Sequence, residues 1–77
     1  MRTGLQLIDL PPGHSAVVRT LEADSGLRQR LEAMGLRAGQ TVTMLRRGQW
    51  AGPLHVRVGM TELMVRRREA RGITLDR

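Results

Sequence analysis

The spacing of apolar residues between positions 26 and 34 is typical of a helix. Leu27, Leu31 and Met34 recur after four and then three residues, so a helix would carry all three on one face. Most residues between them are charged or polar and would fall on the opposite face. The spacing therefore predicts a short helix over about residues 26–34 with a single apolar stripe.

Both ends of this segment carry residues that favour helix boundaries. Asp24 or Ser25 can cap the first turn by accepting a hydrogen bond from a free backbone N–H. Gly35 follows the stripe and can adopt the left-handed conformation that ends many helices. Leu36 is then expected to fold back onto Leu31, because an apolar contact of this kind accompanies a glycine cap.

Most of the remaining chain alternates apolar with polar residues, which is the period of a half-buried β-strand. A first strand is predicted over residues 15–21, after the turn at residues 11–13. Further strands are predicted at four places: residues 40–46, 54–58 and 61–66, and the pair Ile73 and Leu75. Residues 67–71 are too polar for a strand and are expected to form one helical turn. Short strands joined by glycine turns predict a mostly β fold, a small barrel with one short helix inserted between strands.

Length and composition restrict the class of protein. The chain has 77 residues, which fits one domain over residues 1–77, and it has no cysteine for disulfides or thiolate metal sites. No apolar run approaches the roughly 20 residues of a membrane span. The apolar cluster at residues 5–10 is too short for a secretory signal. We therefore expect a soluble, cytoplasmic protein that reaches a membrane only through a partner.

The basic charge of the chain has two interpretations. The net charge is +6, and all 13 basic residues are arginine. Such a surface suits an acidic partner or phosphates, but it can also reflect the composition of the source organism together with ordinary solvation. The cluster Arg66-Arg67-Arg68 with Arg71 is open to the same alternatives, a solvated edge or a face turned toward an acidic patch.

The residue patterns that support catalysis are absent. The seven acidic residues form no spaced pair, and no serine lies in a G-x-S-x-G elbow. The sequence also lacks a glycine-rich loop of the kind that binds phosphates. We therefore predict that the protein is not an enzyme.

Two histidines are the candidate metal ligands. His14 and His55 could bind a transition metal with Asp9 or Glu62 as a third ligand. No i, i+4 spacing supports a site, and both histidines are expected to face solvent. The sequence predicts no cofactor beyond a weak association with a transition metal.

Trp50 is the only aromatic residue of the chain, and it falls in the expected loop between the two middle strands. One interpretation is a lid that folds over an end of the barrel and enlarges a small core. The other is an exposed anchor for a partner, because tryptophan is enriched at binding hot spots. The sequence leaves both open.

Five segments occur in the order and at the spacing found in the FeoA family. They are Leu7 with residues 10–13 (LPPG), residues 30–39 (RLEAMGLRAG), 42–47 (VTMLRR), 53–58 (PLHVRV) and 63–73 (LMVRRREARGI). The chain thus resembles the FeoA family over nearly its whole length. This resemblance implies an SH3-like barrel with a helical insertion.

The resemblance also implies a function. FeoA proteins are accessory proteins of ferrous iron transport, and the implied partner is the cytoplasmic, G-protein-bearing region of the membrane transporter FeoB. The expected contact residues are Trp50, Arg46, Arg47 and Arg57, followed by Arg28, Arg30 and Arg37 of the helix. The family often has PLGDP where residues 49–53 read QWAGP, and Met60 replaces a glycine, so the partner-facing surface is expected to differ.

The alternative is a small basic barrel that acts as a regulatory or nucleic-acid-binding module. The positive charge allows it. The single aromatic argues against single-stranded nucleic acid, whose bases stack on several aromatic side chains. Some iron-dependent repressors carry a FeoA-like barrel joined to a helix-turn-helix module, for which this chain is expected to have no room.

Overall fold

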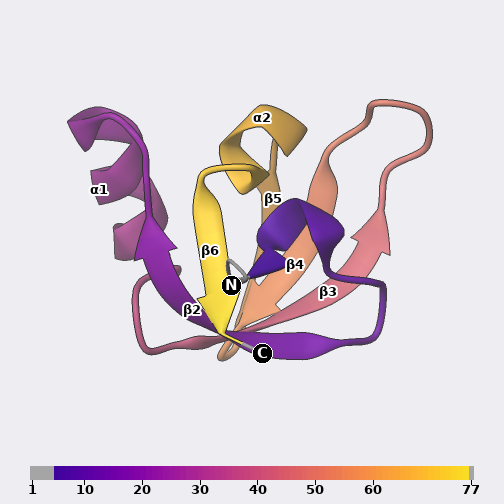
Figure 1. Ribbon diagram of the computed structural model, residues 1–77, viewed down its shortest axis with the longest axis horizontal. Coiled ribbons are helices and arrows are strands. Elements are labelled where there is room, and N and C mark those ends of the chain that lie inside the picture. The colour runs from indigo at the N-terminus through magenta and orange to yellow at the C-terminus, as the bar shows by residue number, and fades with distance from the viewer. Residues whose placement is uncertain (1–4, 77) are drawn as a thin grey trace.

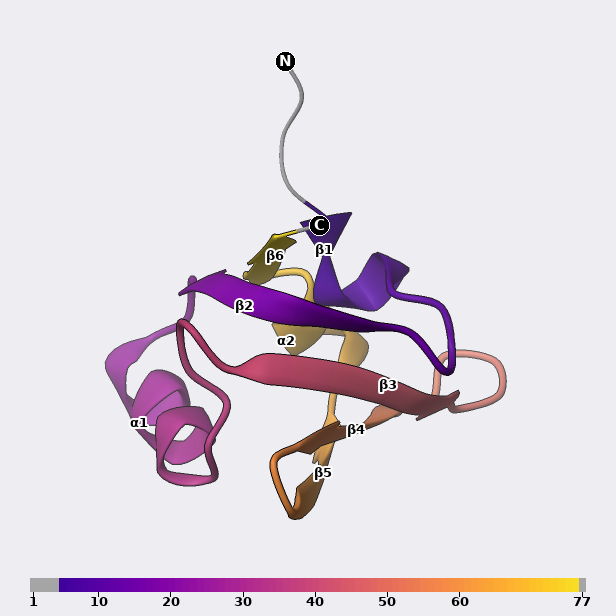
Figure 2. The same cartoon turned by 90° about the horizontal axis from the view of Figure 1, so that it is seen from below.

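Six antiparallel strands form one curved sheet in the computed structural model, which describes residues 5–76 (Figure 1). The strands are β1 (Leu5–Gln6), β2 (Ser15–Leu21), β3 (Thr41–Arg47), β4 (Leu54–Val58), β5 (Thr61–Val65) and β6 (Ile73–Asp76). The helical segments are η1 (Leu7–Asp9), α1 (Ser25–Ala33) and α2 (Arg67–Ala70). Strands pair in the order β1-β6-β2-β3-β4-β5. Figure 2 shows β2 and β3 side by side across the middle of the molecule.

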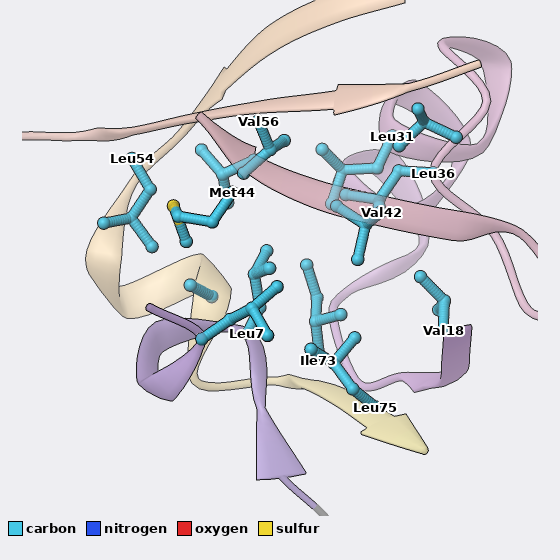
Figure 3. Packing of buried hydrophobic residues seen from close by; sticks show 14 of the residues in the cluster. Leu7, Val18, Leu31, Leu36, Val42, Met44, Leu54, Val56, Ile73 and Leu75 are labelled. Atoms are coloured by element: carbon cyan, nitrogen blue, oxygen red, sulfur yellow. The ribbon is translucent and has the colours of Figure 1, made fainter. Parts of the chain in front are cut away.

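The core is apolar throughout and is enclosed by the curved sheet. Leu7 and Ile73 face Val42 and Met44 across it, and each of these side chains is at most 1% exposed (Figure 3). Among residues 5–76, every residue that is buried as a whole is apolar, although the Glu69 side chain is only 7% exposed. Because the core of the described chain is apolar, the polar chemistry of these residues lies at or near the surface.

Helix α1 has the boundaries that its sequence predicts. The Leu27 N–H donates to the Asp24 Oδ1 at 2.9 Å, so Asp24 is the N-cap. At the other end Gly35 has a φ of 100°, and the Leu36 N–H donates to the Leu31 carbonyl at 2.9 Å. Leu31 and Leu36 are both almost fully buried, which confirms the predicted apolar contact after the glycine cap.

The predicted strands are confirmed to within one residue at their ends. The strands at residues 15–21 and 54–58 have the expected bounds, and the helical turn expected at residues 67–71 forms α2. The Arg66 N–H donates to the Glu69 Oε1 at 3.1 Å, which satisfies one backbone donor at the start of that turn.

A register irregularity in β3 was not expected. Met44 pairs with Val56, but the next pair joins Arg46 to His55, so Leu45 is an extra residue in β3. In a regular strand Met44 and Arg46 would share a face. The extra residue instead puts Arg47, paired with Leu54, on the side of the core.

Residues 5–9, which precede the turn at residues 11–13, form two short elements that the hydrophobic pattern did not predict. Strand β1 pairs with β6, and η1 follows it directly. Leu7 and Leu10 are buried, so this segment closes one end of the core. The Arg47 Nη1 donates to the carbonyls of Ile8 at 2.6 Å and Leu10 at 3.3 Å, which ties the segment to β3.

Residues 1–4, which precede the apolar cluster considered as a secretory signal, lie outside the described residues. No helix in the described part of the chain has the length and apolar character to cross a membrane.

Candidate functional site

Trp50 lies in the loop that joins β3 to β4, defined here as the β3–β4 loop (residues 48–53). Its side chain is 95% exposed, so it does not act as a lid over the core. Its backbone φ is 60°, the left-handed region that side chains other than glycine rarely adopt. The only aromatic side chain of the protein is therefore exposed to solvent, on a residue with a disfavoured backbone conformation.

Hydrogen bonds fix the shape of the β3–β4 loop. The Gly48 N–H donates to the Pro53 carbonyl and the Gly52 N–H donates to the Gln49 carbonyl, both at 2.9 Å. From α2, the Arg67 Nε donates to the Gly52 carbonyl and the Arg67 Nη2 donates to the Gly48 carbonyl, again at 2.9 Å. One half-buried guanidinium thus holds both ends of the loop.

Close backbone packing at the base of this loop requires a glycine. A Cβ atom added at Gly48 would lie 2.6 Å from the Pro53 carbonyl oxygen and 2.8 Å from the Gly52 carbonyl carbon. Both contacts are with backbone atoms that cannot rotate away. The loop is therefore built for one conformation, with Trp50 at its tip.

The six arginines among the expected contact residues have different surroundings in the structure. Arg47 has its guanidinium engaged with backbone carbonyls of the N-terminal segment, so its role is structural. Arg46 and Arg57 are exposed on β3 and β4, and Arg57 pairs in register with Glu62 of β5. Arg28 and Arg37 are exposed near the two ends of α1.

Two adjoining clefts lie beside the β3–β4 loop and share Pro53 and Arg66. The first has a volume of about 390 Å³ and the second about 280 Å³. The first is lined by Ala51, Pro53, Arg66, Arg67 and Arg68. The second is lined by Arg30, Pro53, Met64, Arg66 and Glu69. We call the two together the basic cleft, because four arginines and one glutamate line it.

Elements distant in the sequence meet at the basic cleft. Figure 1 shows α1, α2 and the β3–β4 loop along the upper side of the molecule, with α2 between the other two. Arg30 of α1 lies 3.5 Å from the carboxylate of Glu69 in α2, and Arg66 approaches the same carboxylate at 3.5 Å. Of the six expected contact arginines, Arg30 thus lines the same cleft as Pro53 of the loop. The sequence marked Arg66–Arg68 as a basic cluster but gave no signal that it lies against the β3–β4 loop.

Each histidine lies near one of the acidic residues named with it. The His55 Nε2 is 2.9 Å from the Glu62 Oε1, and both side chains are partly exposed. His14 lines a separate cleft that also contains Asp9. Residues 5–76 contain no cluster of three or more histidine, cysteine or acidic side chains that could hold a metal ion.

The family model and the similar solved structures point to the same family. A family model for the FeoA domain matches residues 5–77. FeoA of Stenotrophomonas maltophilia, solved in complex with zinc and described as a procaryotic SH3 domain protein, is 33% identical. That match covers 94% of this chain and 89% of the other, with a TM-score of 0.80. No protein with curated annotation gives a significant sequence match.

Other solved structures extend the comparison. FeoA of Chlorobium tepidum is 33% identical over 94% of this chain and 69% of the other, with a TM-score of 0.89. A manganese-dependent transcriptional repressor has a TM-score of 0.83, but it is 18% identical and the match covers 42% of its chain. The repressor therefore shares the fold alone. The predicted mostly β, SH3-like fold is confirmed, and the chain belongs to the FeoA family.

Proposed function

We propose that this protein is a non-catalytic, cytoplasmic accessory protein of ferrous iron transport. It binds the cytoplasmic G-protein region of a FeoB-type transporter and modulates that transporter from the inner face of the membrane. The surface centred on Trp50 makes the contact. Family membership supports a role in ferrous iron transport, since the FeoA of S. maltophilia has been suggested to be a ferrous iron transport activating factor.

The exposure of Trp50 carries the proposal. Burying a large aromatic side chain contributes favourably to folding, and this chain leaves its only one 95% in solvent. A left-handed backbone at a residue other than glycine costs about 1 kcal/mol more. Both costs are offset if the indole becomes buried against a partner, because tryptophan offers a large contact area with few torsions to immobilise.

The exposed arginines have a different role in this proposal. Arg46 and Arg57 lie on the outward side of the strands next to the loop, while Arg28 lies in α1 and Arg37 follows it. Charges at the rim of an interface mainly accelerate association and contribute less to affinity. The Arg57→Glu substitution is accordingly expected to lower the association rate, with an effect that fades as salt is added.

Binding of the purified cytoplasmic region of the transporter to immobilised protein tests the proposal. Trp50→Ala is expected to weaken binding by about 2 kcal/mol or more, as truncation of a hot-spot residue does. Val17→Ala is the control, because Val17 is also an exposed apolar residue but lies in β2 and not in the β3–β4 loop. Equal loss of affinity in both variants, or no binding by the unaltered protein, would contradict the proposal.

The alternative function, a regulatory or nucleic-acid-binding barrel, receives less support. The likeness to the manganese-dependent repressor concerns the fold, and this chain spans 42% of that protein. A duplex and a single-stranded oligonucleotide titrated in parallel with the transporter region would distinguish the two functions.

A further inference from the structure

We infer that the basic cleft is the docking site for an acidic, extended peptide segment of a protein partner. The inference rests on the proposed function, because it gives the chemical class of the partner segment that binds beside the β3–β4 loop. It concerns Arg66 and Arg68, which are separate in sequence from the strand arginines considered above.

The charge of the basic cleft is poorly neutralised by the protein itself. Glu69 is its one carboxylate, and the Glu69 side chain is 7% exposed and already approached by Arg30 and Arg66. Arg68 is exposed and forms no ion pair with a carboxylate among residues 5–76, although a neighbouring hollow that it borders contains Glu22 and Asp24. The remaining positive charge therefore faces solvent and favours an anionic ligand.

The basic cleft also offers apolar contacts. Pro53 is exposed and belongs to both parts of the cleft, and Met64 on the wall of the second part is 55% exposed. Ala51 borders the first part next to Trp50 in the sequence. A ligand that fits this surface has carboxylates for the guanidinium groups and aliphatic or aromatic side chains for Pro53 and Met64.

Peptide carboxylates suit these arginines better than a nucleic acid does. The planar guanidinium binds a carboxylate with two parallel hydrogen bonds, which gives direction as well as charge. Single-stranded nucleic acid would need further stacking partners, and the chain has one aromatic residue. The walls carry both charged and apolar residues, which matches a peptide that has side chains of both kinds.

The wall of the basic cleft is formed before any ligand arrives. Arg67 is held by its two hydrogen bonds to the β3–β4 loop, which fixes α2 against the loop. Arg30 and Arg66 are both oriented by Glu69. A site whose side chains are already ordered loses less conformational entropy on binding.

Short fluorescein-labelled peptides test the inference. The probe alternates glutamate with leucine, and the matched peptide has glutamine at every glutamate. We expect the acidic peptide to bind and the glutamine peptide to bind at least about tenfold more weakly. Each replacement of glutamate by glutamine removes charge-assisted hydrogen bonds to the arginines. Binding should also shift the emission of Trp50, the sole aromatic residue.

Matched arginine variants locate the binding site. The double variant Arg66→Gln/Arg68→Gln should weaken acidic-peptide binding about tenfold or more. The control Arg19→Gln/Arg71→Gln removes the same charge from exposed positions that do not line the basic cleft, and should change binding less than about threefold. Should Arg66→Gln disturb the start of α2, Arg68→Gln alone should retain a weakening of several-fold.

Three results would overturn the inference: equal weakening by the two double variants, equal binding of the two peptides, or tighter binding of an oligonucleotide of equal charge. Parallel measurements with the transporter region separate this inference from the proposed function. If that region binds both double variants as well as the unaltered protein, the function stands and the cleft assignment is wrong. If the acidic peptide binds at the basic cleft while the transporter region does not bind, the cleft assignment stands and the proposed function is wrong.

Discussion

Arg67 and Gly48 are 19 residues apart in the sequence, yet the Arg67 Nη2 donates a hydrogen bond to the Gly48 carbonyl at 2.9 Å. The Nε of the same guanidinium donates to the Gly52 carbonyl. Helix α2 therefore determines the shape of the β3–β4 loop that carries Trp50. Substitutions in α2 should therefore alter the conformation of the loop around Trp50, although α2 and Trp50 are far apart in the sequence.

Replacing Arg67 tests this coupling. Arg67→Gln should destabilise the protein by about 1–3 kcal/mol, because two backbone carbonyls lose a charged donor. Hydrogen exchange at the Gly48 and Gly52 amides should accelerate, since the loop opens more often than the whole fold. Arg71→Gln, one helical turn further along, serves as the control. Identical exchange in both variants would show that Arg67 does not hold the loop.

Two glycine substitutions should act in opposite directions. Gly48→Ala forces a Cβ atom to within 2.6 Å of a backbone oxygen, so the loop must shift and stability should fall by more than about 1 kcal/mol. Gly26→Ala lies in α1 with only a 3.6 Å contact to the Asp24 side chain, and should raise stability by about 0.5 kcal/mol. Denaturant unfolding measures both, and the same sign for the two would contradict the geometry.

The role of Arg47 is structural, and its substitution should affect folding. Arg47→Gln removes the donor to the Ile8 and Leu10 carbonyls and should cost about 1–3 kcal/mol of unfolding free energy. Arg46→Gln, the adjacent exposed residue, should change stability by less than about 0.5 kcal/mol. Thermal unfolding decides the point. A larger effect at Arg46 would mean that the extra residue in β3 is placed wrongly.

The apolar face of α1 should be essential for stability. Leu31 is 1% exposed, so Leu31→Ala should cost about 2–5 kcal/mol, a large share of the stability of a domain this small. Arg28→Ala on the exposed face is the control. An unchanged melting temperature for Leu31→Ala would show that α1 does not pack on the sheet.

Local patterns predicted most of the fold. The stripe ending in Met34, the cap at Gly35 and the alternation in β4 depend on neighbouring residues, and such patterns are visible in a sequence. The β1 strand has two residues and its partner β6 lies near the other end of the chain. No local period marks so short a strand, which is why it was not predicted.

The candidate site was harder to predict because it depends on tertiary packing. The sequence singled out Trp50 and grouped it with its neighbours Arg46 and Arg47. The extra residue in β3 turns Arg47 toward the core side, and the arginines beside the loop come instead from α1 and from α2 with its N-cap. The spacing of apolar residues predicts neither the register irregularity in β3 nor the packing of α2 against the β3–β4 loop.

The fluorescence of Trp50 tests the central claim most directly, because the chain has one tryptophan and no tyrosine. With the indole 95% exposed, emission of the free protein should be red-shifted and readily quenched by iodide or acrylamide. Adding the cytoplasmic region of the transporter, with its own tryptophans replaced, should move the emission to the blue and protect it from quenching. Emission that is already blue-shifted and protected in the free protein, or a complex in which Trp50 stays fully accessible, would contradict the account.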